Sequence, residues 1–268
     1  MSNKKLSDFK ALLFDVDRTL TDTNCNISTE VIFALNKLNQ EGFTIGVCSG
    51  RGTPHLLNKV LPIFPENSLH ITTSGSRLIN SKGKIFWEQS IEEETIKNLR
   101  KYIAENNMLA VFFKNDALYA IDPILTNLKN NPWDVIVKNL NKMTNDGIGA
   151  VYIPNPNDET LRYIENASLS YKKMNDNFGN PYIDITPKGI NKSSTLKRWS
   201  EYTGIPPEKI IAFGDSLNDM EFLQACGFKV AMGNSVTEIK KIADRVIGHT
   251  DNNSLAEYLT KIIQGGDL

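Results

Sequence analysis

The chain has 268 residues, of which 40% are hydrophobic and 23% are charged, as is usual for a globular protein. Its 30 basic and 31 acidic residues give a formal net charge of −1, so it lacks the basic excess of proteins that bind nucleic acids or membrane surfaces. No apolar run reaches the ~18 residues of a transmembrane helix, no signal-peptide pattern opens the chain, and three cysteines are too few for a disulfide scaffold, so we expect a cytoplasmic protein.

The first part of the chain alternates short apolar runs with helical patterns. Ala11–Phe14 is apolar throughout, Phe43–Cys48 is a second run, and Leu69–Thr73 is a third. Helices are predicted between them, one opening at Ser28 or Thr29 and one at Thr53-Pro54. Short strands that are apolar on both faces and alternate with helices are typical of a parallel α/β sheet.

The pattern changes after Ser76. Two hairpins, three helices and two further strands are predicted: 77–80 with 84–88, 109–114 with 118–121, helices at 90–106, 127–142 and 158–167, and strands at 150–153 and 182–185. Ser90 and Glu93 have the spacing of a capping box for the first of these helices. Adjacent hairpins with helices predict an inserted α+β domain over residues 78–187.

From Pro187 the parallel pattern resumes. Strands are predicted at 209–213, 228–232 and 245–247, and two late helices are predicted to open with capping boxes of Ser235 with Glu238 and Ser254 with Glu257. The predicted architecture is therefore an α/β core in two pieces, residues 1–77 and 188–268, interrupted by the inserted domain.

Polar side chains follow several of the predicted core strands. Ligands of open α/β sheets bind beyond the carboxyl ends of the strands, and the residues placed there are Asp15, Asp17, Ser49, Asp215, Asn218 and Asp219, with Lys192 opening the helix before the strand at 209–213. Carboxylates that converge on one crevice repel one another unless a cation lies among them, and an all-oxygen site suits Mg²⁺. Lys192, Ser49 and the N–H of Gly50 would then face the oxygens of a phosphate. A carboxylate nucleophile that forms an aspartyl-phosphate is one solution for phosphoryl transfer.

Four of these segments resemble the sequence motifs of the haloacid dehalogenase superfamily. Asp15–Thr21 (DVDRTLT) resembles the first motif, Ser49–Arg51 the second, Lys188–Lys192 the third and Gly214–Asp219 (GDSLND) the fourth. Their order and spacing, together with Ala231–Asn234, are similar to those of the Cof-type (subfamily IIB) phosphatases. The resemblance implies a Rossmann-like core with an α+β cap between the second and third motifs, which is where this chain has its insert.

The resemblance also implies a role for each matching residue. Asp15 would be the nucleophile and a Mg²⁺ ligand, Asp17 the acid and base with a Mg²⁺-binding carbonyl, and Asp215 the third protein ligand of the metal. The phosphate would be held by Ser49, Gly50, Lys192 and Asn218, with Thr19 and Asp219 supporting the site. The implied activity is hydrolysis of small phosphorylated metabolites, sugar phosphates above all.

Two positions depart from the family pattern. Arg18 stands where the family usually has glycine, so we expect this loop to adopt an ordinary backbone conformation or the side chain to point outward. The segment Thr73–Ser76 lacks the asparagine that commonly precedes its glycine.

Other readings remain open at this point. A sugar phosphomutase of the same superfamily would carry the same four motifs, and a catalytically silent phosphometabolite-binding protein could also keep the fold. Arg51 and Lys188 are interpreted as loop or hinge residues, and the three histidines as structural. Closure of the cap is expected about hinges near Ser74–Ser76 and Pro187–Gly189. Nothing in the sequence specifies an oligomeric state.

Overall fold

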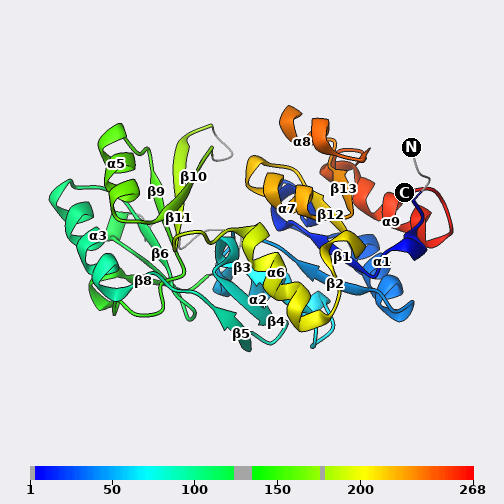
Figure 1. Ribbon diagram of the computed structural model, residues 1–268, viewed down its shortest axis with the longest axis horizontal. Helices are drawn as coiled ribbons and strands as arrows, with labels where there is room; N and C mark the ends of the chain where they lie inside the picture. The colour runs from blue at the N-terminus through cyan, green and yellow to red at the C-terminus, as the bar shows by residue number, and fades with distance from the viewer. Residues whose placement is uncertain (1–3, 124–134, 176–178) are drawn as a thin grey trace.

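The structure is a computed structural model that describes residues 4–123, 135–175 and 179–268. Its core is a five-stranded parallel sheet in the order β14-β13-β12-β1-β2. The strands are β1 (Ala11–Phe14), β2 (Thr44–Val47), β12 (Ile210–Gly214), β13 (Phe228–Ala231) and β14 (Arg245–Val246). Because β1 and β12 are neighbours, the segments that follow them meet at one edge of the sheet although they are distant in sequence (Figure 1).

The side chains of β1 point alternately into two apolar layers, which explains why the strand is hydrophobic throughout. Leu12 and Phe14 belong to one buried cluster, and Ala11 and Leu13 belong to the other. The covering helices are α1 (Thr29–Gln40), α2 (Thr53–Lys59), α6 (Lys192–Thr203), α7 (Met220–Ala225), α8 (Thr237–Ile242) and α9 (Ser254–Ile263). A strand buried on both faces needs helices on both faces, as the parallel sheet predicted.

A small antiparallel sheet adjoins β2. It consists of β3 (Leu69–Thr72), β4 (Arg77–Asn80) and β5 (Ile85–Glu88), and a parallel bridge between Cys48 and Ile71 connects β3 to the core sheet. The hairpin predicted over 77–88 is confirmed. Its strands pair with β3, so the predicted domain boundary at residue 78 falls inside β4.

The inserted segment contains a six-stranded sheet in the order β10-β11-β9-β6-β7-β8. Its strands are β6 (Val111–Phe113), β7 (Leu118–Ala120), β8 (Val137–Asn139), β9 (Ala150–Pro154), β10 (Ser170–Asn175) and β11 (Pro181–Thr186). Helices α3 (Glu93–Glu105) and α5 (Asp158–Asn166) cover its outer face (Figure 1). Ile183 and Ile185 of β11 pack into the apolar layer beneath these helices. Asp184 and Thr186, which alternate with them, lie on the opposite face of the sheet, toward the parallel-sheet domain.

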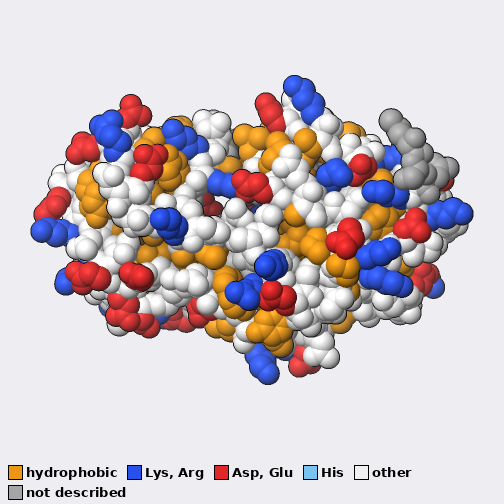
Figure 2. All heavy atoms as spheres, in the orientation of Figure 1, with side chains coloured by type: hydrophobic (Ala, Val, Ile, Leu, Met, Phe, Trp, Pro, Cys, Tyr) orange, Lys and Arg blue, Asp and Glu red, His pale blue; other side chains and the backbone are white. Residues whose placement is uncertain are grey.

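Short helical turns complete the described chain. A π-type turn covers Val16–Leu20, and 3₁₀ turns cover Leu6–Asp8, Leu61–Ile63, Thr73–Gly75, Leu140–Lys142, Pro207–Lys209, Leu217–Asp219 and Thr250–Asn252. Within the described residues, no helix is both long and apolar enough to cross a bilayer. Basic and acidic side chains are interspersed over the face of the molecule seen in Figure 2.

The helix predicted over 127–142 is wrong where the structure describes it. Val137–Asn139 is strand β8, which pairs in parallel with β7, and Leu140–Lys142 is a 3₁₀ turn; residues 127–134 lie outside the described residues. Val135, Ile136 and Val137 are β-branched, and such a run favours extended backbone when a strand partner is available.

The three predicted capping boxes are also wrong. Helix α3 begins at Glu93 with Glu92 as N-cap, α8 has Val236 as N-cap, and α9 has Asn253 as N-cap. The Ser90 hydroxyl instead donates to Glu88. A serine followed three residues later by glutamate is therefore an ambiguous helix signal, because a nearer partner can take the hydroxyl.

His70, on β3, is a buried titratable group of the core. Its Nδ1 accepts a hydrogen bond from the Val47 N–H at 3.2 Å, and its Nε2 lies 2.9 Å from the Ser81 hydroxyl, which itself donates to the Pro65 carbonyl. Nε2 must then donate, so the ring is neutral and its protonation would break the bond from Val47. Burial lowers the pKa of His70 to about 3.

This geometry predicts a pH-dependent stability. The folded-state pKa of His70 lies below its ordinary value, so its contribution is complete above pH ~6.5 and is lost as the pH falls towards 3. Urea unfolding at several pH values measures this effect. Between pH ~7 and ~4, the free energy of unfolding of the wild type should fall by a few kcal/mol more than that of His70→Gln, since one pKa unit is about 1.4 kcal/mol. Equal pH dependence in the two proteins would contradict this assignment.

Candidate active site

One buried ammonium group lies between two buried carboxylates at the carboxyl edge of the core sheet. The Nζ of Lys192 is 2.5 Å from Oδ1 of Asp15 and 2.6 Å from Oδ1 of Asp219. Asp15 directly follows β1, Asp219 closes the turn after β12, and Lys192 is the first residue of α6. The fold thus joins three of the four sequence motifs through a single side chain, and burial of its charge requires both carboxylates.

The start of α6 is fixed by its N-cap and by the close approach of the turn Thr73–Gly75. The Asn191 side chain accepts from the Ser194 N–H at 2.8 Å, and the Ser194 hydroxyl accepts from the Asn191 N–H at 2.9 Å. Gly75 has a φ of +101°, and a Cβ there would overlap the Asn191 carbonyl. Glycine at 75 is therefore required for the turn to reach α6 and so to set the position of Lys192.

Asp219 organises the turn in which it lies. Its Oδ2 accepts from the N–H groups of Asp215 and Ser216, both at 3.1 Å, while its Oδ1 binds Lys192. A Cβ on Gly214 would come within 2.8 Å of the Asp219 side chain, so only glycine leaves room for this carboxylate. Asp219 therefore orients Asp215 and Lys192, and its predicted supporting role in the site stays a prediction.

The carboxylates of this edge fit a hard divalent cation. One oxygen each of Asp15, Asp215 and Asp219 lies within 4.8 Å of the others. Burial, followed by the neighbouring carboxylates, raises the pKa of Asp15 to about 7 and that of Asp215 to about 8. Mg²⁺ or a similar cation prefers oxygen ligands, and it would stabilise the ionised forms of these buried, clustered carboxylates.

The turn after Asp15 departs from expectation at Arg18. Its φ of 57° is left-handed, so the expected ordinary backbone is wrong, and this is the conformation that glycine adopts with least strain. The Asn234 side chain donates to the Arg18 carbonyl at 2.9 Å, which gives the late Ala231–Asn234 segment a role in holding the turn. Thr19 is buried, and its hydroxyl has no hydrogen-bond partner within the described residues.

Asp17 makes a contact that the sequence analysis missed. The Arg51 guanidinium binds its carboxylate through two hydrogen bonds of 2.9 and 2.7 Å. Burial alone would raise the pKa of Asp17, but Arg51 outweighs burial and lowers it below its ordinary value. The interpretation of Arg51 as a loop or hinge residue is thus incomplete, because it positions the side chain of Asp17. Its place two residues beyond Ser49 at a strand end was the available signal.

The residues predicted to hold a phosphate lie around this edge. Ser49 is buried at the end of β2, where its hydroxyl accepts from the Arg51 N–H at 3.1 Å. A Cβ on Gly50 would lie 3.3 Å from the Ser74 hydroxyl and 3.8 Å from the Asn218 amide nitrogen. Ser49, Gly50 and Asn218 therefore stand on neighbouring loops, whereas Lys192 is engaged with Asp15 and Asp219. Their phosphate contacts remain a prediction.

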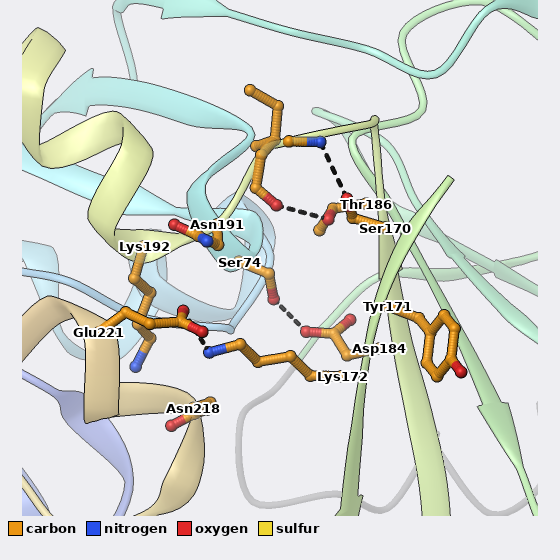
Figure 3. A pocket seen from close by; sticks show the side chains of 12 residues that line it. Ser74, Ser170, Tyr171, Lys172, Asp184, Thr186, Asn191, Lys192, Asn218 and Glu221 are labelled. Carbon is orange, nitrogen blue, oxygen red and sulfur yellow. Dashed lines mark hydrogen bonds and ion pairs between the residues drawn. The ribbon is translucent and has the colours of Figure 1, made fainter. Parts of the chain in front are cut away.

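A cavity of about 180 Å³ lies between this edge and the cap sheet (Figure 3). The core lines it with Lys192, Asn218 and Glu221, and the cap lines it with Lys172 and Asp184 among others. Lys172 on β10 forms a 2.6 Å ion pair with Glu221 on α7, and Asp184 on β11 accepts a hydrogen bond from Ser74. Two polar contacts thus connect cap and core across the cavity.

A family model described as haloacid dehalogenase-like hydrolase matches residues 12–259. The chain belongs to this family. It is 25% identical to the 5-amino-6-(5-phospho-D-ribitylamino)uracil phosphatase YitU of Bacillus subtilis, with 92% of this chain and 95% of the relative covered. It is 23% identical to the HMP-PP phosphatase of Serratia proteamaculans, with 94% of each covered.

Solved structures agree with this assignment at the level of the fold. A haloacid dehalogenase-like hydrolase from Bacteroides thetaiotaomicron has a TM-score of 0.81 at 21% identity, covering 95% of this chain and 99% of its own. The subclass IIB sugar phosphatase BT4131 has a TM-score of 0.77 at 19% identity, covering 94% and 98%. The predicted superfamily and subfamily, the α/β fold and the assignment as a phosphatase of this family are confirmed.

The buried ion group predicts a large effect of Lys192→Ala on stability. Removal of the ammonium leaves Asp15 and Asp219 buried without their counter-charge, so the free energy of unfolding in a chelator should fall by about 3–5 kcal/mol. Lys197→Ala, at an exposed position of the same helix, is the control and should change it by about 0.5 kcal/mol or less. Equal losses in the two variants would contradict the assigned role of Lys192.

Proposed function

We propose that the chain is a Mg²⁺-dependent phosphatase of small phosphorylated metabolites, with sugar phosphates as the first class to test, and that it acts through an aspartyl-phosphate. The observation that supports this best is the position of Asp15, whose carboxylate is held by Lys192, a residue of the cavity wall, and lies next to Asp215. A carboxylate fixed in this way is oriented for attack and surrounded by groups that tolerate added negative charge.

In this mechanism the residues of the chain divide the work. An oxygen of Asp15 attacks phosphorus while Asp17 gives a proton to the departing alcohol oxygen. Because the ion pair with Arg51 keeps Asp17 ionised, its carboxylate would have to part from Arg51 and take up a proton before this step. Asp17 then takes a proton from the water that hydrolyses the aspartyl-phosphate. Ser49, Gly50, Lys192 and Asn218 hold the phosphate oxygens. Mg²⁺ bound by Asp15, Asp215 and the Asp17 carbonyl would offset the charge that the phosphate brings to these carboxylates.

The relatives support the substrate class. The name of YitU describes a phosphate ester on a ribityl chain, and BT4131 is titled a sugar phosphatase. A phosphate on a small polyhydroxylated group fits a cavity of about 180 Å³ that is lined by hydroxyl, carboxylate and ammonium groups. A cytoplasmic location, also part of this proposal, accords with three free cysteines.

We further propose that the insert predicted over residues 78–187 acts as a cap that closes over the core, with its moving part beginning after β5, because β4 and β5 are paired with β3 beside the core sheet. Thr73, Ser74 and Gly75 have consecutive positive φ values, and Gly189 has a φ of +75°. Gly189 lies in the predicted hinge Pro187–Gly189. The predicted hinge Ser74–Ser76 connects β3 to β4, which pair with each other, so the other connection about which the cap could move is the one that follows β5. Closure would exclude bulk water from the aspartyl-phosphate until the leaving group departs.

The role of Asp15 predicts the effect of Asp15→Asn. An amide oxygen is a poor nucleophile, so phosphate release from p-nitrophenyl phosphate should fall by at least about 1,000-fold while the circular dichroism spectrum is unchanged. Asp267→Asn, at an exposed carboxylate far along the chain, should retain full activity. Retained turnover in Asp15→Asn would overturn the covalent mechanism.

The two roles of Asp17 predict a trapped intermediate in Asp17→Asn. p-Nitrophenolate leaves without protonation, so the first step should persist, whereas hydrolysis of the aspartyl-phosphate loses its base and should slow. Rapid acid quench and mass spectrometry should then find phosphorylated Asp15 in this variant and little of it in the wild type. Equal levels of phosphoenzyme would argue against Asp17 as the base.

A further inference from the structure

The cap end of the cavity is built from alternate residues of two paired strands. Lys172 on β10 is directly opposite Asp184 on β11, and Ser170 is opposite Thr186. All four line the cavity, because the intervening Ile183 and Ile185 of β11 pack into the cap's own apolar layer. The pleat of the sheet therefore presents these four polar side chains to the cavity, which Tyr171 of β10 also lines.

Asp184 lies close to the predicted phosphate-binding loop. A Cβ on Gly50 would be 3.9 Å from Oδ2 of Asp184 and 3.8 Å from the Asn218 amide nitrogen. Within the described residues, the Asp184 carboxylate accepts a hydrogen bond from the Ser74 hydroxyl (Figure 3). A carboxylate can accept several hydrogen bonds, so Asp184 can also accept from a ligand. Burial raises the pKa of Asp184 to about 6, which leaves the carboxylate ionised at pH ~7.5.

The cations that line this cavity already have partners. Lys172 is bound to Glu221 at 2.6 Å, and Lys192 is bound to Asp15 and Asp219. Outside the Lys192 group, the charged side chains among the described lining residues are therefore one ammonium, of Lys172, and two carboxylates, of Asp184 and Glu221. Since Lys172 on the cap is paired with Glu221 on the core, the carboxylate of Asp184 is the one charge of this set without an ion-pair partner among the described lining residues, and it gives this part of the cavity an excess of one negative charge.

On the proposed phosphatase function, we infer that Asp184 and Glu221 make the site selective for monophosphates whose leaving group is uncharged or cationic and donates hydrogen bonds. A hydroxyl or ammonium group of the substrate would donate to the Asp184 carboxylate. A second phosphate would instead be placed against two carboxylates with no uncompensated cation to receive it, which is unfavourable in a partly desolvated site.

This selectivity bears on the alternative reading as a phosphomutase. A mutase of this superfamily must bind a sugar bisphosphate, with one phosphate at the nucleophile and the other at the far end of the sugar. The cavity is lined by Asp184 from the cap and Glu221 from the core, so a second phosphate bound within it would meet both carboxylates. The charges of the cavity therefore favour hydrolysis of monophosphates over a mutase cycle.

The experiment compares kcat/KM for glucose 6-phosphate and glucose 1,6-bisphosphate at pH ~7.5 with Mg²⁺. The wild type should favour the monophosphate by about 100-fold or more. Asp184→Asn should reduce this preference by about tenfold, because it removes both the acceptor charge and the repulsion. Glu221→Gln should also reduce it, by releasing Lys172 for the second phosphate.

The Glu221 variant makes the test independent of folding defects. Glu221 is half-exposed, so its substitution should not unfold the chain, and kcat/KM for the bisphosphate should rise in absolute terms, which general damage cannot produce. Asp158→Asn, at an exposed position on the outer helix of the cap, is the control and should leave both substrates unaffected. An unchanged preference in both site variants, or a wild type that favours the bisphosphate, would overturn the inference.

The failure of this inference differs from failure of the proposed function. If the wild type hydrolyses p-nitrophenyl phosphate with Mg²⁺ while the two variants leave the preference unchanged, the inference alone is wrong. If it hydrolyses neither p-nitrophenyl phosphate nor either glucose phosphate, the proposed function and the inference are both wrong.

Discussion

The ammonium group of Lys192 between the carboxylates of Asp15 and Asp219 is the contact on which the candidate site depends. A buried charge is costly unless it is paired, and here the cation of Lys192 compensates two anions, Asp15 and Asp219, which are far from it in the chain. Several local features make sense as means to form this contact. The asparagine cap starts α6 at Lys192, Gly75 lets its turn reach that start, and Gly214 leaves space for Asp219.

The same arrangement leaves the site with excess negative charge. Asp15 and Asp215 have raised pKa values because burial and neighbouring carboxylates disfavour their ionised forms. A divalent cation would stabilise those forms, and a phosphate would then find both a cation and N–H donors. On the other side of the cavity, the pleat of β11 separates the apolar residues that hold the cap together from the polar residue Asp184, which lines the cavity. On our proposal, one strand serves stability on one face and recognition on the other.

Much of this could be predicted from the sequence because the signals are local. Apolar runs predicted the strands of the core, and polar residues just beyond Phe14 and Phe213 predicted where chemistry would gather, since parallel strands end at one edge. The pairing of Asp17 with Arg51, and of Asp184 with Ser74, could not be predicted in this way. Each contact depends on how two loops or two domains pack. The place of Arg51 at a strand end marked it as a candidate, but no spacing within either segment specifies its partner.

The errors have similar physical causes. The sequence pattern around Val137–Asn139 predicted a helix, but the segment pairs with β7 and is a strand. Pairing with a distant strand therefore determined its structure. Arg18 adopts a left-handed backbone although it is not glycine, because the turn after Asp15 is held by Asn234 from the other end of the chain. In both places a contact between distant residues outweighs the local preference of the sequence.

The measurement that tests the central claim most directly is phosphate release from a panel of phosphorylated metabolites, with Mg²⁺ and with a chelator. The panel should include hexose, pentose and polyol phosphates, nucleotides, pyridoxal phosphate and p-nitrophenyl phosphate. Our account predicts release that requires Mg²⁺ and is fastest with sugar or polyol monophosphates. Absence of release from every member by the folded, Mg²⁺-supplied protein, or release that a chelator leaves unchanged, would contradict it.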